Sequence, residues 1–178
     1  MSRDEQKKGG KGMLRLRPYR AADAPVILSW CGGEIPFYQW TAGRLGDYPI
    51  TQEQFAAVQA LMPFTAFDEE GPAGFFTLRS PGEGTDELRF GFVIVDPRRR
   101  GRGLGREMLR LGLTFAFDLY GAGRASLGVF ENNPAALRCY LAAGFRPVPL
   151  EPPETYRVLG EDWPCVEMRI EATGQRGV

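Results

Sequence analysis

The segment from residue 88 to residue 119 limits the fold more than any other part of the chain. It opens with Leu88–Val95, a run of apolar, β-branched and aromatic residues that is typical of a buried strand. Pro97 ends this run, and a loop rich in arginine and glycine follows it. Apolar residues then recur at helical spacing from Leu104 to Leu119. A strand, a glycine-rich loop and an amphipathic helix in direct succession predict an α/β fold in which the helix packs on the sheet.

Patterns on either side of this segment predict further strands. Alternating or β-branched runs indicate strands at 14–17, 63–68, 73–79 and 125–130, and a closing hairpin at 156–159 and 165–170. Together with the helices, they predict one mixed sheet with helices on its faces. We expect a single domain over residues 13–172, a disordered tail at 1–12 and a short C-terminal tail at 173–178.

Capping signals place the remaining helices. Asp23 can cap a short helix that runs to about Trp30. Thr51 and Gln54 form a capping box for a helix that reaches Leu61. Asn133 and Pro134, as N-cap and first helical residue, open a third helix that ends before Gly144. Residues 31–50 are predicted to form a long loop.

The composition excludes several classes of function. Histidine is absent, which rules out Ser-His-Asp and Cys-His nucleophilic machinery and argues against a zinc site, so we expect no metal. Lys plus Arg equals Asp plus Glu at 22 each, unlike the strongly basic composition of nucleic-acid binders. No apolar stretch approaches the roughly 20 residues that a membrane span needs. Three widely spaced cysteines fit reduced thiols in a cytoplasmic protein.

The loop Arg100–Gly105 is predicted to bind a diphosphate. Its glycines let the backbone approach a ligand, and the N–H groups at the start of the following helix attract anions. The spacing fits neither a P-loop, which needs GxxxxGK[ST], nor the GxGxxG fingerprint, whose third glycine is replaced by Arg106 or Met108. A solvated basic loop and an arginine-rich RNA patch stay open as alternatives.

Two motifs resemble those of the GNAT superfamily of N-acetyltransferases. The first is VIVDPRRRGRGLGR at 93–106, in which Arg100, Gly103 and Gly105 match the family pattern [QR]xxGx[GA]. The second is NPAALRCYLAAGF at 133–145, which is similar to the family's N-x-x-A-x-x-x-Y-x-x-x-G-F helix. The element order from residue 14 to 170 also resembles this family, whose sheet is mostly antiparallel with helices on both faces.

The resemblance implies a binding site for acetyl-CoA, the expected cofactor. The pantetheine arm would pair with the strand backbone at 93–95, and the pyrophosphate would lie on the loop. The implied cofactor-binding residues are Val93, Ile94, Val95, Arg100, Gly101, Arg102, Gly103, Leu104, Gly105, Arg106, Asn133, Ala136 and Tyr140. The reaction would be direct attack of a primary amine, from a small molecule or peptide, in a ternary complex. Tyr140 matches the general acid that protonates the departing thiolate.

The general base and the acceptor are less defined. Some family members carry a strand glutamate where this chain has Gly128, so the base lies elsewhere; Glu87, Glu131, Glu34, Asp47 and solvent water are candidates. The acceptor site is expected between the 31–50 loop and the final hairpin, with substrate contacts from Phe37, Tyr38, Trp40, Asp47 and Tyr48. The alternative function is a non-catalytic acyl-CoA-binding or regulatory module. A homodimer is left open.

Overall fold

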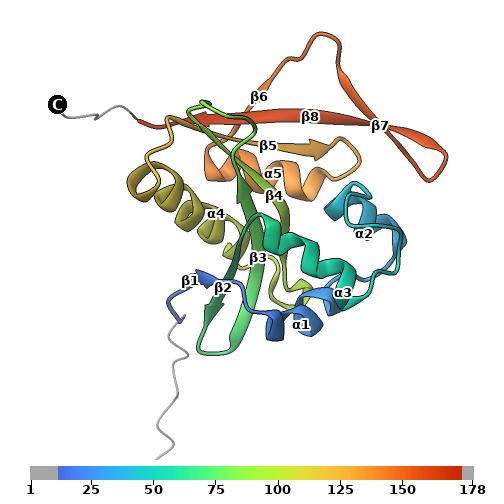
Figure 1. The fold of residues 1–178 in the computed structure, drawn as a ribbon, viewed down its shortest axis with the longest axis vertical. Helices are drawn as coiled ribbons and strands as arrows, with labels where there is room; N and C mark the ends of the chain where they lie inside the picture. Colours follow the sequence, from blue (N-terminus) through green and yellow to red (C-terminus); the bar gives the residue numbers. More distant parts are fainter. Residues whose placement is uncertain (1–11, 174–178) are drawn as a thin grey trace, which may run out of the picture.

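The computed structural model describes residues 12–173 as one eight-stranded sheet with helices on both faces (Figure 1). Along the sheet the strand order is β1-β2-β3-β4-β5-β8-β6, with β7 also paired to β8. The strands are β1 (Arg15–Pro18), β2 (Met62–Asp68), β3 (Gly71–Arg79), β4 (Glu87–Val95), β5 (Arg124–Phe130), β6 (Arg146–Val148), β7 (Glu154–Val158) and β8 (Glu161–Glu171). Among the described strands only β4 and β5 pair in parallel, so the predicted mixed, mostly antiparallel sheet is confirmed.

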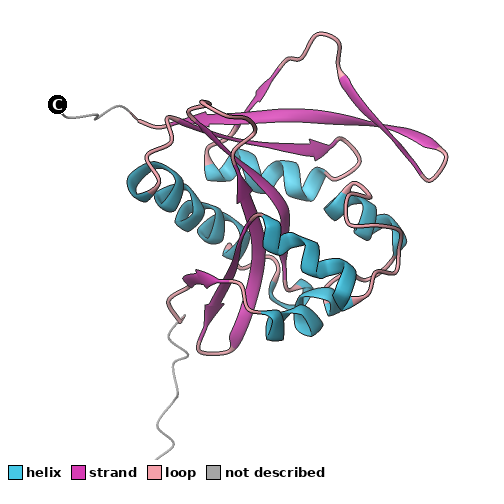
Figure 2. Ribbon diagram, viewed as in Figure 1, coloured by secondary structure: helices cyan, strands magenta, loops and turns pink. Residues whose placement is uncertain are grey.

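Five α-helices cover the sheet (Figure 2): α1 (Ala24–Ser29), α2 (Glu34–Thr41), α3 (Gln52–Phe55), α4 (Leu104–Thr114) and α5 (Pro134–Ala143). Because successive strand residues point to opposite faces, Phe75 and Phe76 belong to different cores. Phe76 packs in the cluster under α4 and α5, whereas Phe75 packs in the cluster with α1 and α3. No helix in the described range is long and apolar enough to cross a membrane.

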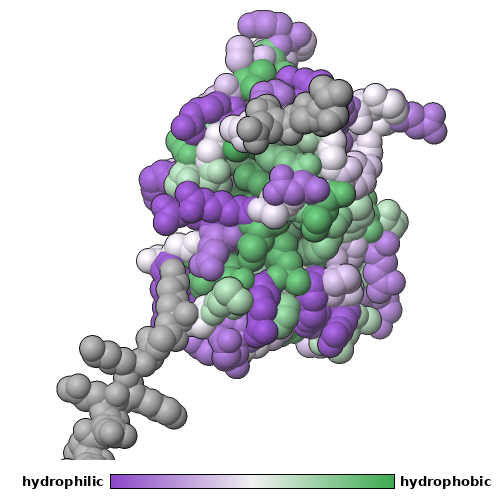
Figure 3. All heavy atoms as spheres, turned by 90° about the vertical axis from the view of Figure 1, so that its left-hand side faces the viewer, coloured by the Kyte–Doolittle hydropathy of each residue, from purple (hydrophilic) through white to green (hydrophobic). Residues whose placement is uncertain are grey.

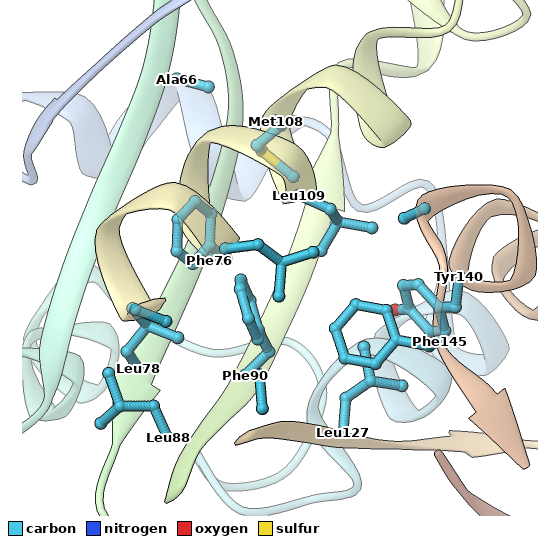
Figure 4. Packing of buried hydrophobic residues seen from close by; sticks show 14 of the residues in the cluster. Ala66, Phe76, Leu78, Leu88, Phe90, Met108, Leu109, Leu127, Tyr140 and Phe145 are labelled. Carbon is cyan, nitrogen blue, oxygen red and sulfur yellow. The ribbon is translucent and has the colours of Figure 1, made fainter. Parts of the chain in front are cut away.

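The larger core holds the central strand against α4 and α5. Figure 4 shows Phe90 of β4 at its centre, with Leu78 on one side and Phe145 on the other. α4 packs closely here because Gly112 has no side chain; a Cβ at this position would lie 2.6 Å from the Phe90 ring. Figure 3 views the side that carries α4 in Figure 1 and shows apolar surface between polar margins.

Most of the predicted caps are confirmed. Thr51 and Gln54 form the capping box, Asn133 accepts a hydrogen bond from the Ala136 N–H at 3.2 Å, and Gly144 is left-handed with φ 110°. The helix over 51–61 is irregular, with an α-helical turn followed by a 3₁₀ segment at 56–60. Similarly, α4 ends at Thr114 and a π-helical turn continues to Leu119.

Two local predictions are wrong. Residues 31–50 are not one long loop, because α2 forms within them. Pro36 is tolerated because it lies in the first turn of α2, where a backbone N–H would have no partner within the helix. Phe37 stabilises α2, since its side chain is buried against neighbouring aromatic rings. Asp23 does not cap α1 through its side chain; it accepts hydrogen bonds from Arg17 and Thr65 instead.

Two other features fall outside the predictions or the described residues. The short strand β6 was not predicted, since three residues carry too little periodicity to detect. The expected tails at 1–12 and 173–178 lie almost wholly outside the described residues. The three cysteines, Cys31, Cys139 and Cys165, are free thiols, in agreement with the prediction.

Candidate active site

The central strand β4 separates from its neighbour β5 halfway along its length. The two strands pair at only three positions, from Glu87 opposite Arg124 to Arg89 opposite Ser126. Beyond that point β4 continues to pair with β3, while β5 continues with β8, and Figure 1 shows the two groups of strands running in different directions. The edge of β4 that faces β5 is therefore without strand pairing from Phe90 to Val95.

A β-bulge lies where the two strands diverge. The register between β3 and β4 shifts after Thr77 pairs with Gly91, and Phe92 has a φ of 49°, a left-handed conformation that is rare for an aromatic residue. Bulges bend a strand and increase its local twist. Strain of this kind in a non-glycine residue is concentrated at functional sites. The bulge thus gives a physical cause for the opening between β4 and β5.

A cavity of about 690 Å³ occupies this opening. Its volume lies in the range of small-molecule and cofactor sites. It is lined by β4 from Phe90 to Val95, by the loop and first turn of α4, by Leu127–Val129 of β5, and by residues of α5. Trp30, Trp40 and Arg99 also line it, and each has a buried side-chain nitrogen with no hydrogen-bond partner within the described chain. Buried donors are normally satisfied, so unpaired donors beside a cavity set this region apart from the rest of the core.

The loop after β4 is fixed by two ion pairs. Asp96 is buried and accepts hydrogen bonds from the Arg98 backbone and side chain, which lowers the pKa of its carboxyl group. Arg99 is also buried and binds the carboxylate of Asp68 at the end of β2. The hydrogen bond between them raises the pKa of Arg99 and lowers that of Asp68. The first pair fixes the turn of the loop itself, and the second ties the loop to the end of β2.

The first turn of α4 points into the cavity without a side-chain cap. Gly101 and Gly103 have φ values of 75° and 78°, so they adopt the left-handed turn that glycine permits. No side chain caps the helix at Gly103, and the stretch from Gly103 to Arg106 lines the cavity. Uncapped N–H groups and the helix dipole make this position favourable for an anion. Gly105 allows close helix packing, since a Cβ there would lie 2.9 Å from the Cys139 sulfur.

Tyr140 of α5 lies on the opposite wall of the cavity. Its side chain is 7% exposed and packs against Phe145 with ring centroids 6.4 Å apart (Figure 4). Burial raises the pKa of its phenol, so the hydroxyl keeps its proton at neutral pH. Asn133 lines the same cavity; its side-chain oxygen caps α5, which leaves its amide nitrogen as a donor.

A second, smaller cavity of about 130 Å³ adjoins the first. Both are lined by Gln39, Trp40, Phe90, Gly91, Phe92 and Gly128. The smaller cavity also receives Tyr156 of β7 and Cys165 of β8, together with Arg44, Arg79 and Arg89. It therefore lies between α2, the β3–β4 pair and the final hairpin, where the sequence predicted the acceptor site.

The larger cavity brings together all of the predicted cofactor-binding residues except Arg102, which does not line it. The predicted acceptor residues are mostly elsewhere. Of those, Trp40 lines both cavities, while Phe37 is buried among aromatic rings, and Asp47 accepts a hydrogen bond from Tyr38 at 3.3 Å. Tyr48 is half exposed and lines neither cavity.

No carboxylate of the described residues lines either cavity. Glu87, one candidate base, instead pairs with Arg124 and accepts a hydrogen bond from Ser126. Glu34, Asp47 and Glu131 also lie outside both cavities. The residues that sequence reasoning missed are Arg44, Arg79 and Arg89. No local signal marked Arg79 and Arg89, because they come together only through the register of β3 and β4.

Comparison with known proteins identifies relatives of this chain. Residues 29–145, more than half of the chain, match the Acetyltransferase (GNAT) family. A mycothiol acetyltransferase from Rhodococcus jostii is 31% identical over 141 residues, which cover 74% of this chain and 45% of that protein. A spermine/spermidine N(1)-acetyltransferase from Bacillus subtilis is 40% identical over 53 residues, 30% of this chain and 35% of that protein. The chain thus spans less than half the length of these curated relatives.

The fold agrees with solved structures over nearly its whole length. The spermidine N-acetyltransferase from Vibrio cholerae, solved in complex with CoA and spermine, superposes with a TM-score of 0.73. The superposition covers 89% of this chain and 95% of that protein at 18% sequence identity, a level that supports a shared fold.

Proposed function

The chain belongs to the acetyltransferase (GNAT) family, and we propose that it transfers the acetyl group of acetyl-CoA to a primary amine. One observation carries the proposal: the unpaired edge of β4 lines a cavity that is also lined by the uncapped start of α4 and by Tyr140. An extended chain with amide groups can pair with such an edge, and a diphosphate can bind such a helix start.

The residues present fit coenzyme A. The backbone of Val93–Val95 offers donors and acceptors to the pantetheine amides, and the N–H groups of Gly103–Arg106 offer donors to the pyrophosphate. Arg100 and Arg106 add positive charge at the same end of the cavity. When bound, acetyl-CoA supplies an activated acetyl thioester.

The protein's own groups then position the acceptor and move protons. The amine approaches from the smaller cavity, whose walls are shared with the larger one. Tyr140, which is protonated at neutral pH, donates its proton to the departing sulfur, and the tyrosinate then recovers a proton from water because its raised pKa favours the neutral phenol. Because no carboxylate of residues 12–173 lines either cavity, the ammonium proton passes to water. The nearby arginines favour the neutral amine because they repel a further positive charge.

Changing Gly103 to glutamate is expected to lower the affinity for CoA at least about tenfold, because a carboxylate would stand where the pyrophosphate binds. Isothermal titration of CoA measures this change. Gly121→Glu is the matched control: it adds the same charge at another left-handed glycine with open space around it, outside both cavities. Equal CoA affinity in the two variants would contradict the placement of the pyrophosphate.

We also expect kcat/KM to rise with pH as the acceptor amine loses its proton, with no fall up to about pH 9.5. An acid with the ordinary tyrosine pKa near 10 would begin to lose its proton in this range. The raised pKa of Tyr140 moves that loss to higher pH. A pH–rate profile with a fall between pH 8 and 9.5 would point to a different acid.

The more specific predictions about the acceptor, other partners and cellular location form part of this proposal. A peptide or small-molecule amine as acceptor, the lack of a nucleic-acid partner, a homodimer and a cytoplasmic location are all compatible with it. The tail boundaries at 1–12 and 173–178 also stay predictions.

A further inference from the structure

The smaller cavity has an unusual charge pattern for an enzyme that binds amines. Three arginines, Arg44, Arg79 and Arg89, line it, and no aspartate or glutamate of the described residues does. A protonated polyamine entering this cavity would meet charges of its own sign. Like charges in close contact cost several kcal/mol in recognition and are a common means of excluding wrong partners.

Arg79 and Arg89 are directly opposite each other on the antiparallel strands β3 and β4. Side chains at such positions share a face of the sheet, and like charges there are destabilising. A pairing that weakens the sheet without a structural benefit indicates a functional position.

Two of the three arginines are compensated by the protein. Arg89 binds the buried Glu167 at 2.9 Å. Arg44 donates to the Tyr156 hydroxyl at 3.0 Å, and that hydroxyl donates to Glu154 at 2.6 Å. Arg79 differs: it forms no ion pair within residues 12–173. Partial burial, followed by repulsion from Arg89 and Arg44, lowers its pKa, with Glu87 acting weakly in the opposite direction.

We propose that the acceptor amine also carries a carboxylate, which binds the guanidinium of Arg79 in the smaller cavity. The acceptor class is then an amino acid or a related amino carboxylate, with its amine directed toward the wall shared with the larger cavity. The planar guanidinium fork suits a carboxylate, and Arg79, unlike Arg89, has no ion pair among the described residues. This inference rests on the proposed acetyl transfer.

The test uses matched pairs of acceptors with acetyl-CoA: L-amino acids and their carboxamides, short ω-amino acids and their amides, and spermidine. The amides are the weaker bases, so amine basicity alone favours them at neutral pH. We expect kcat/KM to be about 10- to 100-fold higher for the best acid than for its amide, the range of a hydrogen bond to a charged group. Equal rates for acid and amide, or a preference for spermidine, would overturn the proposal.

Arg79→Gln links the preference to this residue. We expect this variant to lose the preference for the acid mainly through KM, and Arg79→Lys to restore part of it. Arg110→Gln is the matched control, because Arg110 is exposed on α4 and lines neither cavity. An unchanged acid preference in Arg79→Gln would assign the carboxylate to another site and overturn the proposal.

A binding measurement separates this inference from the proposed function. CoA titrations of Arg79→Gln are expected to match the wild type, since Arg79 does not line the larger cavity. Normal CoA binding and acetylation of amides but not acids would refute the carboxylate site alone. Failure to acetylate any amine would refute the proposed function.

Discussion

Replacing Tyr140 with phenylalanine is expected to lower kcat about a hundredfold, the lower end of what a general acid contributes. The affinity for acetyl-CoA should hardly change, because phenylalanine keeps the packing against Phe145. We expect kcat to fall because Tyr140 carries the only phenol among the described residues that line the larger cavity, and burial keeps this phenol protonated. Steady-state kinetics with the best acceptor, together with a CoA titration, measure both quantities.

Tyr120→Phe provides the control for this substitution. Tyr120 is half exposed at the end of the π-helical turn and lies outside both cavities, so the same loss of a hydroxyl should leave kcat unchanged. Wild-type kcat in Tyr140→Phe would remove this residue from the mechanism. A parallel fall in kcat and CoA affinity would assign it a packing role instead.

Asp68→Asn is expected to lower the free energy of unfolding by about 3–5 kcal/mol, the typical effect of breaking a buried ion pair by removing one partner. Arg99 would keep its charge in a buried position without the carboxylate that neutralises it. Because Arg99 lies in the loop before α4 and lines the larger cavity, CoA affinity should fall as well. Urea denaturation at pH 7 measures the loss of stability.

Asp162→Asn is the matched control, since its partner Arg157 forms an exposed pair with side chains 68% and 66% accessible. Exposed pairs contribute at most about 1 kcal/mol. A loss below this value in Asp68→Asn would show that the buried pair does not hold the loop.

The same pair has a defined pH dependence. The Arg99 hydrogen bond lowers the folded-state pKa of Asp68 below its ordinary value of 3.8. The contribution of this carboxylate is therefore complete above the unfolded-state value and is lost as the pH falls through the folded-state value. The difference in free energy of unfolding between the wild type and Asp68→Asn should stay constant from pH 5 to 8. It should decrease only below the ordinary Asp pKa of 3.8.

The cofactor side of the site could be predicted because its signals are local. Gly103 at the start of α4, Asn133 as N-cap and Gly144 after α5 each act within a few residues of chain, and the structure confirms these positions. The amphipathic spacing of α4 also depends only on its own sequence. Periodicity and capping rules read such features directly.

The sequence predicted where the acceptor side lies but not most of the residues that line it, because the lining depends on tertiary contacts. α2 forms although most of its residues are aromatic or β-branched and it includes Pro36, since burial of Phe37 outweighs weak helix propensity. The bulge at Phe92 has no sequence signal. The approach of Arg79 to Arg89 follows from the register of β3 and β4, which the pattern of either strand leaves undetermined.

The most direct test of the whole account is a search for acetylated product. Purified protein, acetyl-CoA and the acceptor panel of acids, amides and spermidine are incubated together, and N-acetylated products are detected by mass spectrometry alongside release of the CoA thiol. We predict that CoA release depends on the amine and that an acetylated amino carboxylate accumulates in equal amount. Tight binding of acetyl-CoA with no acetylated product from any acceptor would contradict the enzyme and support a non-catalytic acyl-CoA-binding module.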